Sequence, residues 1–83
     1  MAIGSNRLDV DRDVYSVTYD PAEDGIVGAT VSARFENTDD VSVYTGSNDG
    51  EFVVTVAKGF TGTDHVTITG SESGEVSGEV TFG

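Results

Sequence analysis

Hydrophobic and polar residues alternate along most of this chain with a period of two. The clearest run covers residues 26–36, where one face carries Val27, Ala29, Val31, Ala33 and Phe35. Successive side chains of a β-strand point to opposite faces of the sheet, so this alternation predicts a half-buried strand. Comparable runs cover residues 14–19, 41–45, 51–57, 65–69 and 75–82. The pattern predicts six or seven short strands.

Clusters of Gly, Pro, Asn, Asp and Ser separate these runs and predict turns. They cover residues 20–25, 37–40, 46–50, 59–62 and 70–74. The chain has 83 residues and no cysteine, which fits one small domain held together by packing and not by disulfides. We therefore predict an all-β fold, a small β-sandwich of six to seven antiparallel strands over residues 13–83, with an N-terminal arm over residues 1–12.

Three segments resemble the strands of immunoglobulin-like modules in prokaryotic surface proteins and in the virions of tailed viruses. They are DGIVGATVSARFEN, TGSNDGEFVVTV and GFTGTDHVTITG, and the likeness extends over residues 25–82. The resemblance implies an Ig-like sandwich that adheres, spaces or decorates and does not catalyse a reaction. It rests on glycines and alternating valines, so it bears on the fold more than on the function.

The chain departs from the adhesin pattern, because it is a single module and its opening residues lack the apolar core of a secretory signal peptide. We therefore expect a non-enzymatic virion structural protein, a capsid decoration or accessory module of a tailed virus, assembled in the host cytoplasm. Its partner would be the major capsid protein or another virion protein, and it would form homo-oligomers on a lattice. The alternative is an adhesion or carbohydrate-binding Ig-like module of a cell-surface protein.

The charge of the chain narrows the partners further. The sequence has fifteen acidic residues and a net charge of −11. Its four basic residues are Arg7, Arg12, Arg34 and Lys58. Nucleic acids and anionic membranes bind clustered Lys and Arg, so we expect neither as a partner. No apolar run reaches the length of about 20 residues that a membrane helix needs. An acid surplus with a single lysine also resembles the proteins of extreme halophiles, so we expect a halophilic host.

Little in the sequence indicates catalysis. His65 is the only histidine, and no glycine-rich phosphate-binding motif occurs. A serine nucleophile would need a base within hydrogen-bond reach in a pocket that excludes water, and a small sandwich leaves little room for one. We expect no enzyme activity and no cofactor, and keep a small hydrolase or metal-dependent enzyme as a third interpretation. In the preferred interpretation His65 lies on the surface.

Calcium is the only metal that the sequence suggests. Asp9, Asp11 and Asp13 copy the first half of a calcium-binding D-x-D-x-D-G loop. Val14 replaces the glycine of that motif, and Asp20 replaces its final glutamate. The three aspartates are therefore weak candidates for a metal site, and we favour a hydrated acidic face.

The remaining candidates are residues suited to an interface. In the predicted arm, Ile3 and Leu8 are apolar and would be wasted on water, and Arg12 can pair with a neighbour; in the predicted strands the candidates are Tyr15, Tyr19 and Tyr44. Aromatic and aliphatic side chains of this kind are enriched in protein interfaces, so we predict that these six residues contact a partner. Two alternatives stay open: the tyrosines close the ends of the core, or the arm is frayed.

Overall fold

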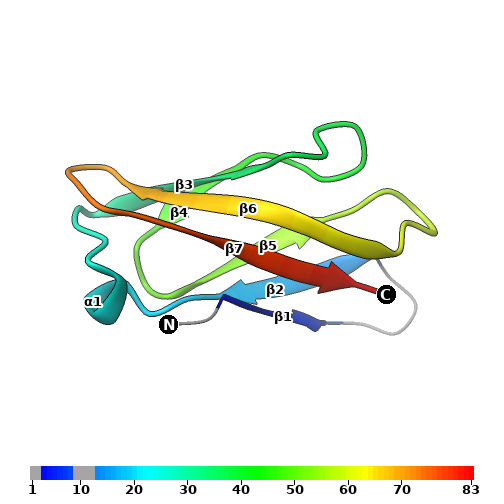
Figure 1. The fold of residues 1–83 in the computed structure, drawn as a ribbon, viewed down its shortest axis with the longest axis horizontal. Coiled ribbons are helices and arrows are strands. Elements are labelled where there is room, and N and C mark those ends of the chain that lie inside the picture. The colour runs from blue at the N-terminus through cyan, green and yellow to red at the C-terminus, as the bar shows by residue number, and fades with distance from the viewer. Residues whose placement is uncertain (1–2, 9–12) are drawn as a thin grey trace.

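The computed structural model describes residues 3–8 and 13–83. These residues form seven strands and one short helix (Figure 1). The elements are β1 (Gly4–Arg7), β2 (Val14–Thr18), α1 (Pro21–Asp24), β3 (Thr30–Phe35), β4 (Tyr44–Ser47), β5 (Glu51–Thr55), β6 (Gly62–Gly70) and β7 (Glu75–Phe82). Every strand pair is antiparallel. The predicted all-β fold is confirmed.

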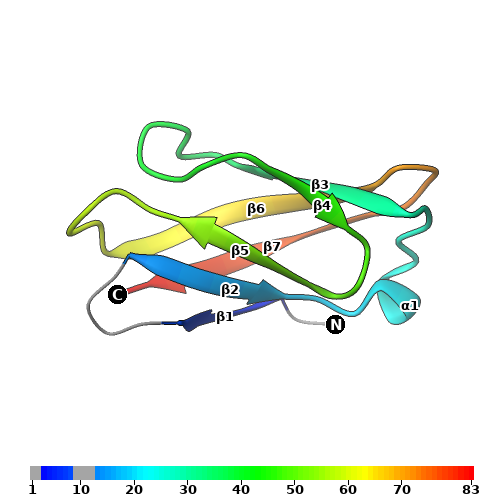
Figure 2. The ribbon, with the colours of Figure 1, turned by 180° about the vertical axis from the view of Figure 1, so that it is seen from behind.

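Two sheets face each other and form a sandwich (Figures 1 and 2). One has three strands in the order β1-β2-β5, and the other has four in the order β4-β3-β6-β7. Their inner faces supply the core, in which Val17 and Val54 meet Val31 and Ile68, all 0–1% exposed. Of the apolar residues predicted to share a face over residues 26–36, Val31, Ala33 and Phe35 are buried, since the burial of β3 alternates at every residue. The prediction was wrong for Val27 and Ala29, which are exposed because the chain bends at Gly28 before β3 begins. Such alternation lets each strand bury one face and hydrate the other.

Phe82 is the centre of an aromatic group inside the sandwich. Its ring centroid lies 4.8 Å from that of Tyr15 in an edge-on arrangement, 6.1 Å from Phe35 and 6.0 Å from Phe60. Aromatic pairs at these distances add to the free energy gained by burial. Because Tyr15 belongs to one sheet and Phe82 to the other, these contacts fix the two sheets against each other.

The chain changes sheets between residues 41 and 47. Val41 forms a bridge with Val56, and the Ser42 N–H donates to the Thr55 carbonyl at 3.3 Å, so this stretch pairs beside the three-stranded sheet. From Tyr44 onward the chain instead pairs with β3 of the other sheet. The single strand predicted over residues 41–45 is therefore two short pairings with different partners.

Part of the predicted N-terminal arm is a strand of the sandwich. β1 pairs with β2 in register from Gly4 opposite Thr18 to Arg7 opposite Tyr15. The Leu8 N–H continues the ladder by donating to the Val14 carbonyl at 3.0 Å. Residues 4–7 therefore belong to the three-stranded sheet and not to an arm outside it.

Candidate interaction surfaces

The outer face of the three-stranded sheet carries little charge. The residues on the side of the sheet away from the core lie in three rows across β1, β2 and β5: Gly4–Thr18–Glu51, Asn6–Ser16–Val53 and Leu8–Val14–Thr55. Ser16, in the middle row, is only 3% exposed. We call these nine residues the neutral face, because Glu51 is its one charged member. The Ser16 hydroxyl donates to the Glu51 carboxylate at 2.5 Å, so even this charge is partly satisfied within the face.

Apolar side chains remain exposed on the neutral face. Leu8 is 52% exposed and Val53 is 48% exposed. Val14 lies between them in the sheet and is half-buried. Single exposed apolar residues are ordinary on a protein surface, but here they coincide with an almost uncharged sheet face.

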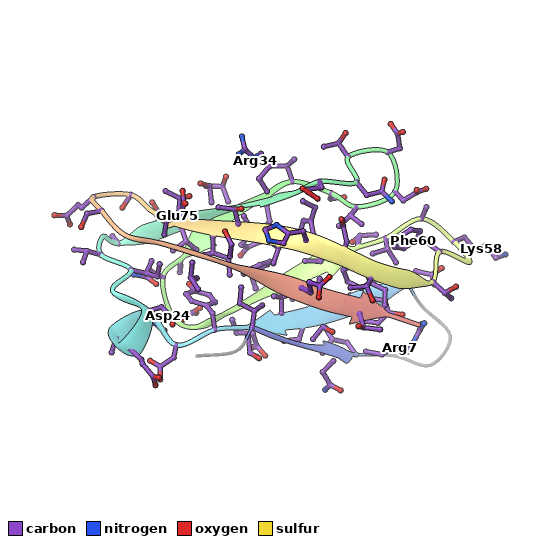
Figure 3. All side chains as sticks on the ribbon, viewed as in Figure 1. Arg7, Asp24, Arg34, Lys58, Phe60 and Glu75 are labelled. Atoms are coloured by element: carbon purple, nitrogen blue, oxygen red, sulfur yellow. The ribbon has the colours of Figure 1, made fainter. Side chains whose placement is uncertain are left out.

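The outer face of the four-stranded sheet is polar and charged. A shallow hollow of about 200 Å³ is lined by Ser32, Arg34, Thr67, Thr69 and Glu75. Figure 3 shows Arg34 and Glu75 on this sheet, far from Lys58 at one end of the sandwich. Thr67 and Ser77 share a hydrogen bond of 3.1 Å beside the hollow, so its surface is built of hydroxyl groups. Within the described residues Arg34 has no carboxylate partner.

Acidic side chains gather at both ends of the sandwich. Figure 1 shows α1 at one end and the loop after β3 at the other. The first end carries Asp20, Glu23, Asp24 and Asp49, and the second carries Glu36, Asp39 and Asp40. Beside Asp39 and Asp40 lies a second shallow hollow, of about 280 Å³, whose floor includes Val41 and Ala57.

The edge where β1 meets β7 closes the sandwich. Ile3 occupies the space beside Gly78, where an added Cβ would come within 3.2 Å of the Ile3 Cδ1 atom. The Ser5 hydroxyl donates to the Thr81 carbonyl at 2.8 Å. Through β1, the N-terminal segment therefore bridges the two sheets.

Arg7 and Tyr15 join this closure at the C-terminal end of β7, where Figure 3 places Arg7. The guanidinium carbon lies 4.7 Å from the Tyr15 ring centroid, and Nη2 donates to the Tyr15 hydroxyl. The Gly83 N–H donates to the same hydroxyl at 2.6 Å. Arg7 also pairs with Asp13 at 3.8 Å. We call the contacts of Ile3, Ser5, Arg7, Tyr15 and Gly83 the β1–β7 clasp.

The six predicted interface residues fall into different environments. Leu8 is on the surface, whereas Ile3 is half-buried in the clasp, and Arg12 lies outside the described residues. Tyr44 is half-buried and stacks on Phe52 at 5.0 Å between ring centroids. Only Leu8 is therefore both described and placed for contact with a partner without rearrangement.

Tyr15 and Tyr19 require a correction. They are 2% and 6% exposed, so both belong to the core and neither can contact a partner while the sandwich is folded. Tyr15 lies in β2 and Tyr19 directly after it, and the alternation of side chains along this stretch points both inward. Their hydroxyls form hydrogen bonds within the protein. Tyr19 donates to the Asn48 side-chain oxygen at 3.1 Å.

The calcium interpretation of the three aspartates stays a prediction. Asp9 and Asp11 lie outside the described residues, and the Asp13 carboxylate is paired with Arg7. Over residues 3–8 and 13–83, no three acidic or histidine side chains come together in a way that could hold a metal ion.

His65 lies half-buried on the outer side of β6, opposite Glu79 of β7. The neighbouring Asp64 is 8% exposed, and its carboxylate accepts from the N–H groups of His65 at 2.8 Å and Asn37 at 3.3 Å. Those bonds hold the loop after β3 against β6, which is a structural task. The sequence did not single out this role, because it depends on a loop that returns to β6.

No family model, curated protein or solved structure matches this chain. The described residues hold no helix that could cross a membrane, since α1 has four residues.

Proposed function

We propose that this chain is a non-enzymatic structural protein, a decoration or accessory module on the virion of a tailed virus. The observation that carries the proposal is the uneven distribution of charge. Acidic groups occupy both ends of the sandwich and part of its four-stranded face, whereas the neutral face has one charged residue, Glu51. This division suits a module on a particle, with one face against protein and a hydrated surface outward.

The resemblance to Ig-like modules and the acid surplus support the same proposal. A net charge of −11 on 83 residues keeps a protein soluble but strains its compact state through self-repulsion. Concentrated salt removes this strain, since the Debye length falls to about 3 Å at 1 M. The proposed setting is therefore a virus of a halophilic host, in which the module assembles with the coat protein or with its own copies.

The test is to locate the protein in an infected culture. An antibody against the purified domain is used for immunogold electron microscopy and for blots of gradient-purified particles. The expected result is labelling of particles at a constant ratio to the coat protein. Protein that stays in the soluble cell fraction while purified particles remain unlabelled would rule the proposal out.

One observation favours a second candidate, an adhesion or carbohydrate-binding module. The hollow around Arg34 offers three hydroxyl side chains and one cation, groups that can hydrogen-bond to sugar hydroxyls and carboxylates. This candidate predicts glycan-array binding that Arg34→Ala abolishes and Lys58→Ala preserves. An array without binding in molar salt would rule it out.

A further inference from the structure

We propose that the neutral face binds the same face of a second copy of this chain, related by a two-fold axis. This inference deepens the proposed function by naming the partner of that face. It rests on the proposal only in taking the neutral face as a contact surface.

Charge restricts how two copies can approach each other. Each carries a net charge of −11, and the acids at the ends and on the four-stranded sheet would face like charges in most arrangements. Opposed carboxylates at close range repel, and burying them adds a desolvation cost. Of the described surfaces, the neutral face brings two copies together with the fewest carboxylates at the contact, since each copy contributes Glu51 alone.

The register of the sheet makes this face complementary to itself. The two-fold axis lies in the plane between the neutral faces of the two copies, perpendicular to the strands and level with Ser16. It reverses each strand, so the first row of one copy lies over the third row of the other. Val53 then meets Val53 of the partner subunit, whereas Ser16, which is 3% exposed, adds little to the contact. An isologous interface requires this kind of matching.

The outer rows match as well under the same axis. Leu8 lies over Gly4 of the partner subunit, so a bulky side chain meets a position that has none. Glu51 lies over Thr55 of the partner subunit, a hydroxyl that can donate to it, and the two Glu51 carboxylates stay at opposite ends of the contact. Within the neutral face, no pair of like charges is opposed.

The size of the face sets the strength of the contact. Three strands about five residues long cover roughly 17 by 14 Å, or about 240 Å². Stable protein interfaces bury about 800 Å² on each partner, so this contact alone is weak in dilute solution. We expect a dissociation constant in the range of about 0.1–1 mM in molar salt, and much stronger association where many copies are held on one lattice.

The experiment is sedimentation equilibrium of the full chain at millimolar concentration in 2 M potassium chloride. The key variant is Val53→Asp, which removes the central apolar contact and opposes two carboxylates. The matched control is Val27→Asp, because Val27 is 47% exposed, as Val53 is 48% exposed, but lies outside the neutral face. We expect the wild type and Val27→Asp to dimerise equally and Val53→Asp to associate at least tenfold more weakly. A monomeric wild type, or an equal loss in both variants, overturns the inference.

A second variant tests the register and does not depend on the folding of Val53→Asp. Thr55→Lys places an ammonium group over Glu51 of the partner subunit, while its own Glu51 is four residues away along a strand. Dimerisation should tighten about three- to tenfold, with a gain that shrinks as salt increases. Thr18→Lys is the control and should not tighten the dimer, because Thr18 lies over Val14 of the partner subunit. An equal effect of the two lysines overturns the two-fold arrangement.

These results separate the inference from the proposed function. A protein that is found on particles but stays monomeric in molar salt contradicts the inference and leaves the function standing. A protein that dimerises through the neutral face but is absent from particles supports the inference and contradicts the function.

Discussion

Asn48 joins three segments of the chain through one side-chain amide. Its Nδ2 donates to the carbonyls of Ile26 and Gly28, both at 3.1 Å, and its Oδ1 accepts from the Tyr19 hydroxyl at 3.1 Å. The amide thus connects the turn between β4 and β5 with the chain before β3 and with the end of β2. A residue used in this way fixes the position of a loop, because removing it takes a hydrogen bond from each of three polar groups.

Replacing Asn48 should destabilise the protein without changing its surface. We expect Asn48→Ala to lower the free energy of unfolding by about 2–3 kcal/mol, since it removes three hydrogen bonds and leaves the carbonyls of Ile26 and Gly28 without their amide donor. Denaturant unfolding followed by circular dichroism measures the change. Asn6→Ala, at an exposed asparagine of β1, is the control and should stay within about 0.5 kcal/mol of the wild type. Equal effects of the two substitutions would contradict this role of Asn48.

Tyr19 makes the stability depend on pH in the alkaline range. Burial raises the pKa of the Tyr19 hydroxyl above its usual value of 10.0, and the carboxylate of Asp49 adds to the rise. The folded protein therefore holds this proton more tightly than the unfolded chain does. The contribution of this group to the free energy of unfolding is fully present below pH 10 and is lost as the pH rises through the folded pKa.

The matching measurement is the unfolding free energy between pH 8 and 12 for the wild type and Tyr19→Phe. At pH 8 we expect the variant to be less stable by about 1 kcal/mol, because it loses the hydrogen bond to Asn48. The difference should shrink above pH 10, where only the wild type must ionise this group. Parallel curves across the whole range would contradict the assignment.

Among the elements, β1 is a short strand that is held in place by side-chain contacts as well as by backbone pairing. It has four residues and pairs with β2 only, but the β1–β7 clasp connects it to the opposite sheet. The edge of a sandwich is where backbone groups lack partners, and the clasp supplies some of them. Arg7 contributes through a cation–π contact, a hydrogen bond and a partly exposed ion pair.

Two arginines of the chain provide a test of the clasp. Arg7→Ala should lower the free energy of unfolding by about 1–2 kcal/mol, from the lost cation–π contact and hydrogen bond at Tyr15. Arg34→Ala, at an exposed arginine of β3 without a partner in the described chain, should change it by less than about 0.5 kcal/mol. Thermal melting of both variants makes the comparison. If the clasp does not stabilise the protein, the two variants would melt at the same temperature.

Most strands could be predicted from the sequence, because alternation reports directly on the burial of one face. β1 could not, since its sequence GSNR contains no apolar residue, and its pairing depends on β2. The change of sheet at residues 41–47 could not be predicted either, because alternation shows which side chains are buried but not which strand lies alongside. The same limit explains Tyr15 and Tyr19, whose burial follows from the layer opposite them.

The candidate surface was predictable only in part. Leu8 was identified as an apolar residue in need of a partner, and it does lie on the neutral face. The rest of that face was not identified, because its three rows combine residues from positions 4 to 55 of the chain. A surface of this kind is defined by strand register, and register is set by tertiary pairing and not by local sequence.

For the whole molecule, the separation of charged and uncharged surface has a consequence for both folding and assembly. Acids crowd the ends of a sandwich whose longest dimension is 35 Å, so in dilute salt most of them lie within a few Debye lengths of one another. Salt relieves repulsion within one copy and between two copies. Folding and self-association are therefore expected to strengthen together.

The salt dependence of folding is the prediction that belongs to this scale. We expect the melting temperature to rise from dilute buffer to 2 M potassium chloride, with most of the gain below about 1 M, where the Debye length reaches about 3 Å. Glu75→Gln/Glu79→Gln, at two exposed carboxylates of β7, should be more stable than the wild type at low salt and gain less from added salt. Sucrose is the control for general exclusion of solutes, which should stabilise the wild type and the variant equally. If the wild type melts at the same temperature in dilute buffer and in molar salt, repulsion between its carboxylates does not limit its stability, and its acid surplus is not an adaptation to a halophilic host.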